Sequence, residues 1–112
     1  MSQYLLLLYN EPDAWSHLSP EEMQKATQKY AAFRTKATTL DGKRLTPDFG
    51  RVIRSNGGKP HTTDGPYSET KEVLGGLYVV EAASYDEAVQ IANTNPHLDY
   101  GGTIEVREIF KM

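Results

Sequence analysis

The order of apolar and polar segments predicts an α+β domain, with an antiparallel sheet and two helices on one of its faces. Two wholly apolar stretches, Tyr4–Tyr9 and Leu77–Val80, have the composition of central strands. Helix starts with capping residues follow them at Ser19 and Ser84, and Asn56-Gly57-Gly58 predicts a β-hairpin insertion between the two halves. Together these elements form two β-α-β-type units that share one sheet, which is the ferredoxin-like arrangement.

Length and composition indicate one ordinary soluble domain, which we place at residues 1–112. The net charge of −3 argues against direct nucleic-acid binding, because such proteins usually have a basic face. The chain contains no cysteine, which excludes disulfides and thiolate metal sites and fits a reducing cytoplasm. The longest apolar run, Tyr4–Tyr9, is far shorter than the ~20 residues of a membrane helix and has no basic leader or cleavage site. We therefore expect a cytoplasmic protein that does not associate with a membrane.

The first helix is predicted to begin at a capping box formed by Ser19 and Glu22. Apolar residues then recur at spacings of three and four, which predicts one buried stripe on a helix of about 20 residues. The members of this stripe are Met23, Ala26, Tyr30, Phe33, Ala37 and Leu40. We expect the helix to end at Asp41-Gly42, and we interpret Tyr30 and Phe33 as core residues.

The other elements are marked by turn and cap signals. Arg51–Arg54 and Lys59–Thr63 are predicted to pair as the hairpin, near a sheet edge because of their charged flanks and a proline. The second helix is expected to run from Ser84 to Asn95-Pro96, and Thr103–Phe110 is expected to form the last strand.

The segment Thr63–Gly76 carries five ionisable side chains between two sets of turn formers. Asp64-Gly65-Pro66 predicts a sharp and stiff turn. Ser68 is predicted to cap a short helical turn, and Gly75-Gly76 is predicted to end it. A rigid corner that presents charged groups just before a core strand is a good position for a site.

The two wholly apolar strands need cover on both faces of the sheet, and the two helices supply it on one face only. An uncovered apolar face would be an unusually large exposed patch. We therefore expect a homodimer in which two sheets pack face to face.

The segment Thr63–Glu72 resembles the signature of the DGPF (DGPFAETKE) proteins, a branch of the YCII-related family. Tyr67 stands where phenylalanine is usual, and Ser68 stands where alanine is usual. Further stretches that carry the resemblance are Leu74-Gly75-Gly76, Tyr4–Tyr9 with Glu11 and Trp15, Ser19–Glu22 and Gly102–Arg107. The resemblance thus covers nearly the whole chain.

The resemblance implies a dimeric, ferredoxin-like α/β barrel from a bacterium. It also implies a link to regulation, because genes of DGPF proteins often accompany those of extracytoplasmic-function sigma factors. YCII-like relatives are suspected of acid/base chemistry through a His–Asp pair whose histidine lies in the first helix. In this sequence the corresponding stretch, around Tyr30 and Ala31, contains no histidine.

The candidate catalytic residues are Asp64, Lys71 and His61. Asp64 is a candidate acid or base, Lys71 its electrostatic partner or an anion-binding group, and His61 a candidate proton shuttle. Alternatively, Asp64 only sets the turn through its own backbone, and Lys71 pairs with Glu69 or Glu72. His61 and Asp64 are three residues apart, so a regular strand would point them to opposite faces and leave His61 in solvent.

The candidate ligand-binding residues are Tyr9, Trp15, Tyr67 and Glu69. Aromatic walls with a few polar groups are typical of small-molecule pockets. The alternative is ordinary packing for the aromatic residues and a solvated charge for Glu69. His61, Asp64, His97 and Asp99 have no recognised ligand spacing, so we expect no metal and no cofactor.

Two functions remain open at this point. The first is binding of a small organic molecule in a cleft beside residues 64–76, with cofactor-independent acid/base catalysis. The second is a non-catalytic regulatory or protein-interaction module, linked to sigma-factor-dependent transcription. Catalysis requires a closed pocket with a perturbed titratable group, whereas a contact surface leaves the segment exposed and flat.

Overall fold

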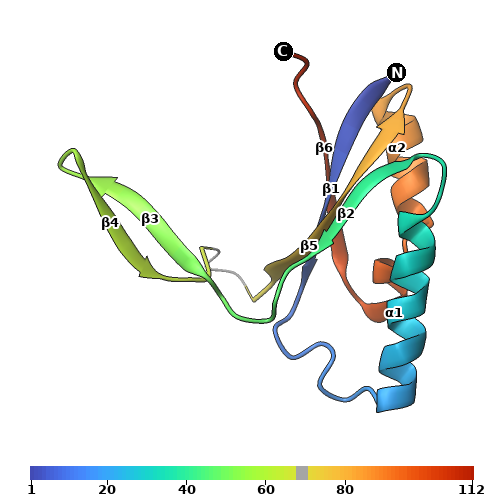
Figure 1. Cartoon of the computed structure of the whole chain (residues 1–112), viewed down its shortest axis with the longest axis horizontal. Coiled ribbons are helices and arrows are strands. Elements are labelled where there is room, and N and C mark those ends of the chain that lie inside the picture. Colours follow the sequence, from blue (N-terminus) through green and yellow to red (C-terminus); the bar gives the residue numbers. More distant parts are fainter. Residues whose placement is uncertain (68–70) are drawn as a thin grey trace.

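A computed structural model describes residues 1–67 and 71–112 (Figure 1). Its elements in chain order are β1 (Ser2–Asn10), α1 (Pro20–Arg34), β2 (Thr39–Arg44), β3 (Arg51–Asn56), β4 (Lys59–Asp64), β5 (Val73–Ala82), α2 (Tyr85–Asn93), the 3-10 helix η1 (Pro96–Tyr100) and β6 (Thr103–Glu108). Strands β2, β5, β1 and β6 form one antiparallel sheet in that order, and β3 pairs with β4 alone. Both α-helices lie on the same side of the main sheet (Figure 1). The predicted α+β, ferredoxin-like arrangement is therefore confirmed.

The hydrophobic core lies between the main sheet and the helices, because every second residue of β1 and β5 points to that face. The buried residues of this core are Tyr4, Leu6, Leu8, Tyr78, Val80 and Ala82 from the strands and Phe33, Ala88 and Ala92 from the helices. The rings of Phe33 and Tyr78 meet edge to face with centroids 4.8 Å apart, which fixes α1 over β5. The capping box predicted at the start of α1 is also present, with Ser19 and Glu22 bonded to each other's backbone N–H.

The opposite face of the main sheet is also apolar. Leu5, Leu7, Leu77 and Val79 alternate with the core residues along β1 and β5 and are only partly buried. Within the described residues both helices lie on the other face (Figure 1). The second subunit that we expect to cover this face stays a prediction.

The first helix is shorter than its apolar stripe suggests, and the expected end at Asp41-Gly42 is wrong. α1 ends at Arg34, and the chain re-emerges in β2, which pairs with the outer side of β5. The β-branched pair Thr38-Thr39 favours an extended chain here, and the ladder with β5 satisfies backbone groups that a longer helix would leave at a bare edge. Leu40, the last member of the predicted stripe, is 43% exposed.

Gly75 and Gly76 lie inside β5, so the expectation that they end a helical turn is wrong. Neither has a positive φ. A Cβ on Gly76 would lie 2.9 Å from the carbonyl oxygen of Lys43, and a Cβ on Gly75 would lie 3.3 Å from the side-chain oxygen of Asn10. The two glycines therefore allow β2 and β1 to approach β5 closely. The cap predicted at Ser68 lies outside the described residues.

The predicted hairpin is present, and it turns at Gly57 and Gly58, which have φ of 62° and 82°. It forms a two-stranded sheet of its own rather than an edge of the main sheet, and it projects away from the rest of the chain (Figure 1). Only Val52 is partly buried, and every other hairpin residue is exposed. The radius of gyration is accordingly 15.8 Å, against about 13 Å for a compact domain of this length.

Candidate functional site

A cavity of about 350 Å³ lies on the helix side of the main sheet, where α1 spans β1, β5 and β2. Pockets that hold small organic molecules typically start near this size, at about 300 Å³. Its aromatic lining residues are Trp15, Tyr30, Phe49 and Tyr78. Its ionisable lining residues, apart from the two tyrosines, are Arg34, Lys43, Arg44, Asp48 and His97. The segment 73–78 of β5 forms one wall, so the cavity adjoins the end of the signature segment.

A buried histidine and a tyrosine form a hydrogen-bonded pair in this lining. His97 is 4% exposed, and its Nε2 lies 2.7 Å from the main-chain carbonyl oxygen of Tyr9. Its Nδ1 lies 2.8 Å from the hydroxyl oxygen of Tyr30. Because a carbonyl oxygen can only accept, Nε2 carries the proton and donates to Tyr9. In the neutral ring Nδ1 then accepts the hydroxyl proton of Tyr30.

Burial keeps both members of this pair neutral. Removal from water lowers the pKa of His97 below its ordinary value of 6.5, although the bond to the Tyr9 carbonyl opposes this shift. Burial raises the pKa of Tyr30 above its ordinary value of 10.0. It also raises the pKa of the neighbouring Tyr78 to about 12. At neutral pH the cavity therefore contains an uncharged phenol that donates to an uncharged imidazole.

The position of the His97 ring is fixed by the segment around η1. Asn95 caps this helix and accepts the main-chain N–H of His97 at 2.9 Å. Gly102 lies directly against the imidazole, and a Cβ at this position would collide with Nε2. The ring is thus held by its own helix cap and by a glycine that leaves room for it.

Aromatic contacts link the pair to the loop before α1. Trp15 meets the ring of Tyr30 with centroids 5.8 Å apart and that of Tyr100 with centroids 5.1 Å apart. Tyr30 also stacks on Tyr100 at 6.4 Å. These contacts place the only tryptophan of the chain beside the phenol of the pair, so its fluorescence is a suitable probe of ligand binding in the cavity.

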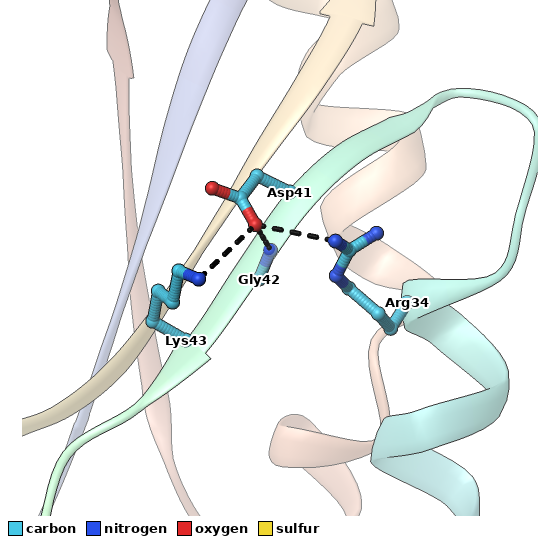
Figure 2. Close-up of polar contacts among 4 residues, drawn as sticks. All are labelled: Arg34, Asp41, Gly42 and Lys43. Atoms are coloured by element: carbon cyan, nitrogen blue, oxygen red, sulfur yellow. Dashed lines mark hydrogen bonds and ion pairs between the residues drawn. The ribbon is translucent and has the colours of Figure 1, made fainter.

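The cationic residues of the lining differ in how they are paired. Figure 2 shows the Asp41 carboxylate between Arg34 at 3.2 Å and Lys43 at 3.9 Å, while it accepts the N–H of Gly42. Arg44 follows directly at the end of β2. Its register partner is Gly76, so it lies on the helix side of the sheet.

The three candidate catalytic residues lie apart from this pair. Asp64 ends β4 with a side chain that is 87% exposed and pairs with Arg51 at 3.5 Å. His61 is exposed on the same strand and faces Arg54 in the register. Strand alternation places it on the opposite face of the hairpin from Asp64. Lys71 lines a second cavity of about 340 Å³, so these three residues do not share one site.

The candidate ligand-binding residues divide between locations. Trp15 lines the first cavity. Tyr9 contributes its carbonyl to His97, while its hydroxyl donates to Glu105 at 3.1 Å on the opposite face of the sheet. Tyr67 is 75% exposed and lies under Arg54 at 5.2 Å. Glu69 lies outside the described residues.

The turn at Asp64-Gly65-Pro66 has a visible packing role. The N–H of Gly65 donates to the carbonyl of Gly50 at 3.1 Å, which closes the base of the hairpin. A Cβ on Gly65 would collide with the carbonyl oxygen of Phe49. Since Phe49 lines both cavities, this turn positions a wall that they share.

Sequence reasoning did not select Tyr30, Arg44 or His97 as site residues. The stripe on α1 indicated core packing for Tyr30, and Asn95-Pro96 indicated only the end of a helix. One signal was available, because Tyr30 occupies the stretch where YCII-like relatives have their suspected histidine. No local pattern pointed to His97, which lies 67 residues from its partner.

Comparison with known proteins identifies the family. The model of the YCII-related domain matches residues 2–112. An uncharacterised protein of Rhizobium meliloti (strain 1021) is 34% identical over 116 residues, covering 95% of this chain and 90% of the relative. The chain is therefore a member of the YCII-related family, as the signature segment indicated.

Residues 1–67 and 71–112 contain no group of three or more histidine, aspartate or glutamate side chains placed to hold a metal ion. In the same residues no helix has the length and apolar character needed to span a membrane.

Proposed function

We propose that this YCII-related protein binds a small organic molecule in the helix-side cavity and catalyses cofactor-independent acid/base chemistry there. The observation that carries the proposal is the buried Tyr30–His97 pair in the wall of an aromatic cavity. A titratable pair shifted by burial and placed in a pocket is typical of catalytic sites.

The pair suits proton abstraction from a bound molecule. The hydroxyl oxygen of Tyr30 keeps a lone pair, because its proton is already donated to His97. A substrate proton passes to this oxygen as the phenolic proton passes to Nδ1 of His97. The products are a substrate anion and an imidazolium whose Nε2–H still donates to the Tyr9 carbonyl. Return of both protons in the reverse order protonates the product.

The residues selected from the sequence have defined places in this proposal. Trp15 packs against the ring of Tyr30 and is positioned to contact a ligand in the cavity. Lys71 lines the second cavity, which shares Phe49 with the first, and would meet a larger ligand there. Asp64 acts through the turn that supports Phe49, and His61 on the exposed hairpin would serve partner contacts.

A non-catalytic protein-interaction module is the second candidate, and the projecting hairpin favours it. An isolated two-stranded hairpin is marginally stable in water. Ile53 in its middle is 68% exposed, so a binding partner would bury it. This candidate includes the regulatory role linked to sigma-factor-dependent transcription.

Ligand binding is tested by titration of Trp15 fluorescence with a panel of small acids and their primary amides. The panel contains benzoate, phenylacetate, phenylbutanoate, naphthoate and octanoate. We expect at least one member to change the emission, and Ala31→Phe to abolish that change because Ala31 lines the cavity. Ala32→Phe is the matched control, since Ala32 is an exposed neighbour outside the lining. If no panel member binds, or if both variants behave alike, the interaction module is favoured.

We also propose that the partly buried face of Leu5, Leu7, Leu77 and Val79 pairs with a second copy of the chain. Sedimentation velocity should give a dimer for the native chain and a monomer for Leu7→Glu. Val89→Glu is the control, because Val89 is 43% exposed on α2, away from this face. A native monomer would contradict the homodimer.

A further inference from the structure

We propose that the helix-side cavity selects an aromatic carboxylate, with Arg44 as the group that binds the carboxylate. The inference rests on the proposed function, because it identifies the class of molecule that the same cavity binds. It is argued from which charged residues around the cavity already have partners, and from the aromatic side chains in the cavity walls.

Arg44 differs from the other four arginines of the chain. Each of those has a partner: Arg34 pairs with Asp41 at 3.2 Å, Arg51 with Asp64 at 3.5 Å, Arg107 with Glu105 at 3.6 Å, and Arg54 lies over the ring of Tyr67 at 5.2 Å. Within residues 1–67 and 71–112, no hydrogen bond or ion pair engages the guanidinium of Arg44. An unpaired guanidinium in a cavity wall is available to an anionic ligand.

Among the described residues, the carboxylates of Asp41 and Asp48, which lie within four residues of Arg44 in the chain, are already engaged by other groups. Asp41 accepts from Arg34, Lys43 and a backbone N–H (Figure 2). Asp48, which lines the cavity, accepts from the Thr46 hydroxyl and from a backbone N–H, both at 2.8 Å. These bonds lower the pKa of Asp48 below its ordinary value. The lining therefore carries three cations and one carboxylate, although the whole chain has a net charge of −3.

The surroundings of Arg44 leave space for the ligand. Its register partner on β5 is Gly76, so no side chain lies directly opposite it on that strand. The Arg44 charge also acts on the phenol of Tyr30, whose pKa it lowers against the larger effect of burial. Because Arg44, Tyr30 and His97 line the same cavity, a carboxylate bound at Arg44 would share that cavity with the Tyr30–His97 pair.

The remaining walls of the cavity indicate what kind of group the carboxylate is attached to. Trp15, Phe49 and Tyr78 present aromatic surface, which favours a planar apolar group. A single unpaired guanidinium provides one planar fork, which matches one carboxylate. The structure thus assigns a monocarboxylate on an aromatic body to this cavity.

The test compares each acid of the panel with its own amide by isothermal titration calorimetry. A charge-assisted hydrogen bond contributes enough to make the acid bind about tenfold to a hundredfold more tightly than the amide. Arg44→Gln should reduce acid binding to the level of the amide and leave amide binding unchanged. Arg54→Gln is the matched control, since it removes the same charge outside the cavity and should preserve the preference.

The outcomes separate this inference from the proposed function. If acid and amide bind equally to the native chain, or if the preference survives in Arg44→Gln, the carboxylate inference is overturned while the cavity remains a binding site. If neither form of any pair binds, both proposals fail. Phenyl phosphate is a further probe, and tighter binding of it than of phenylacetate would overturn the choice of a carboxylate.

Discussion

Two regions of this molecule carry His61 and His97, and they differ in how far they expose these side chains to solvent. The hairpin and its base present His61 and Asp64 to solvent, the latter with a side chain that is 87% exposed. The region between α1 and η1 buries His97 and uses both of its ring nitrogens. The sequence candidates His61 and Asp64 lie in the exposed region, whereas the buried pair joins Tyr30, which the sequence assigned to the core, to His97, which it did not select as a site residue.

The difference shows which environment suits a titratable side chain for catalysis. An exposed ion pair such as Arg51–Asp64 is screened by water and contributes at most about 1 kcal/mol. A buried imidazole has lost its water, so burial lowers its pKa, and its two hydrogen-bond partners determine which ring nitrogen carries the proton. A segment rich in charged residues is therefore more often an exposed surface than a catalytic site.

The largest expected effect separates the two histidines. We expect His97→Ala to lower the free energy of unfolding by about 2–4 kcal/mol, because it removes two buried hydrogen bonds and leaves a void. His61→Ala should change it by less than about 0.5 kcal/mol, as for other exposed side chains. Urea denaturation followed by circular dichroism measures both. Equal losses of stability in the two variants would show that the hairpin is packed as tightly as the core, and would contradict the contrast between the two regions.

The next effect is a dependence of stability on pH that comes from the buried His97. Because the pKa of folded His97 is below 6.5, the unfolded chain binds a proton there before the folded chain does. The contribution of His97 is therefore complete above about pH 6.5 and is lost as the pH falls toward the folded pKa, by at most about 1.4 kcal/mol per pH unit. Denaturation midpoints between pH 5 and pH 8 measure it, within the range where histidine titrates.

Two variants sharpen this pH test. Tyr30→Phe removes the hydroxyl that donates to the neutral ring, so the pKa of His97 should rise and the slope should shrink; an NMR titration of the imidazole measures this directly. Tyr67→Phe is the control, because Tyr67 is 75% exposed and should leave the titration unchanged. A pKa of His97 that is the same in Tyr30→Phe and in the native chain would contradict the pair.

The sequence predicted those parts of the fold that depend on neighbours along the chain. The capping box of Ser19 and Glu22, the cap at Ser84 and the apolar strand Tyr4–Tyr9 are local signals, and the structure contains all of them. The end of the first helix was not predictable in this way. The apolar stripe continued past Arg34 by coincidence, while pairing with β5 decided the actual structure.

The candidate site depended even more on distant contacts. Tyr30 meets His97 only because α1 and η1 pack side by side, and Gly102 admits the ring only in the folded chain. The spacing of these residues in the sequence does not predict these contacts. By contrast, Trp15 could be selected from the sequence, because aromatic side chains commonly line small-molecule pockets.

The smallest expected effect lies within the signature segment and separates two adjacent residues. Asp64→Asn should lower the free energy of unfolding by less than about 0.5 kcal/mol, because its pair with Arg51 is exposed on both sides. Gly65→Ala should cost about 1–3 kcal/mol, since the added methyl group would displace the backbone at Phe49. Urea denaturation of the two variants, together with Trp15 fluorescence in the presence of a bound panel acid, distinguishes stability from site geometry. If Asp64→Asn abolishes ligand binding while stability is kept, Asp64 takes part in the site directly, and the turn is more than a support for Phe49.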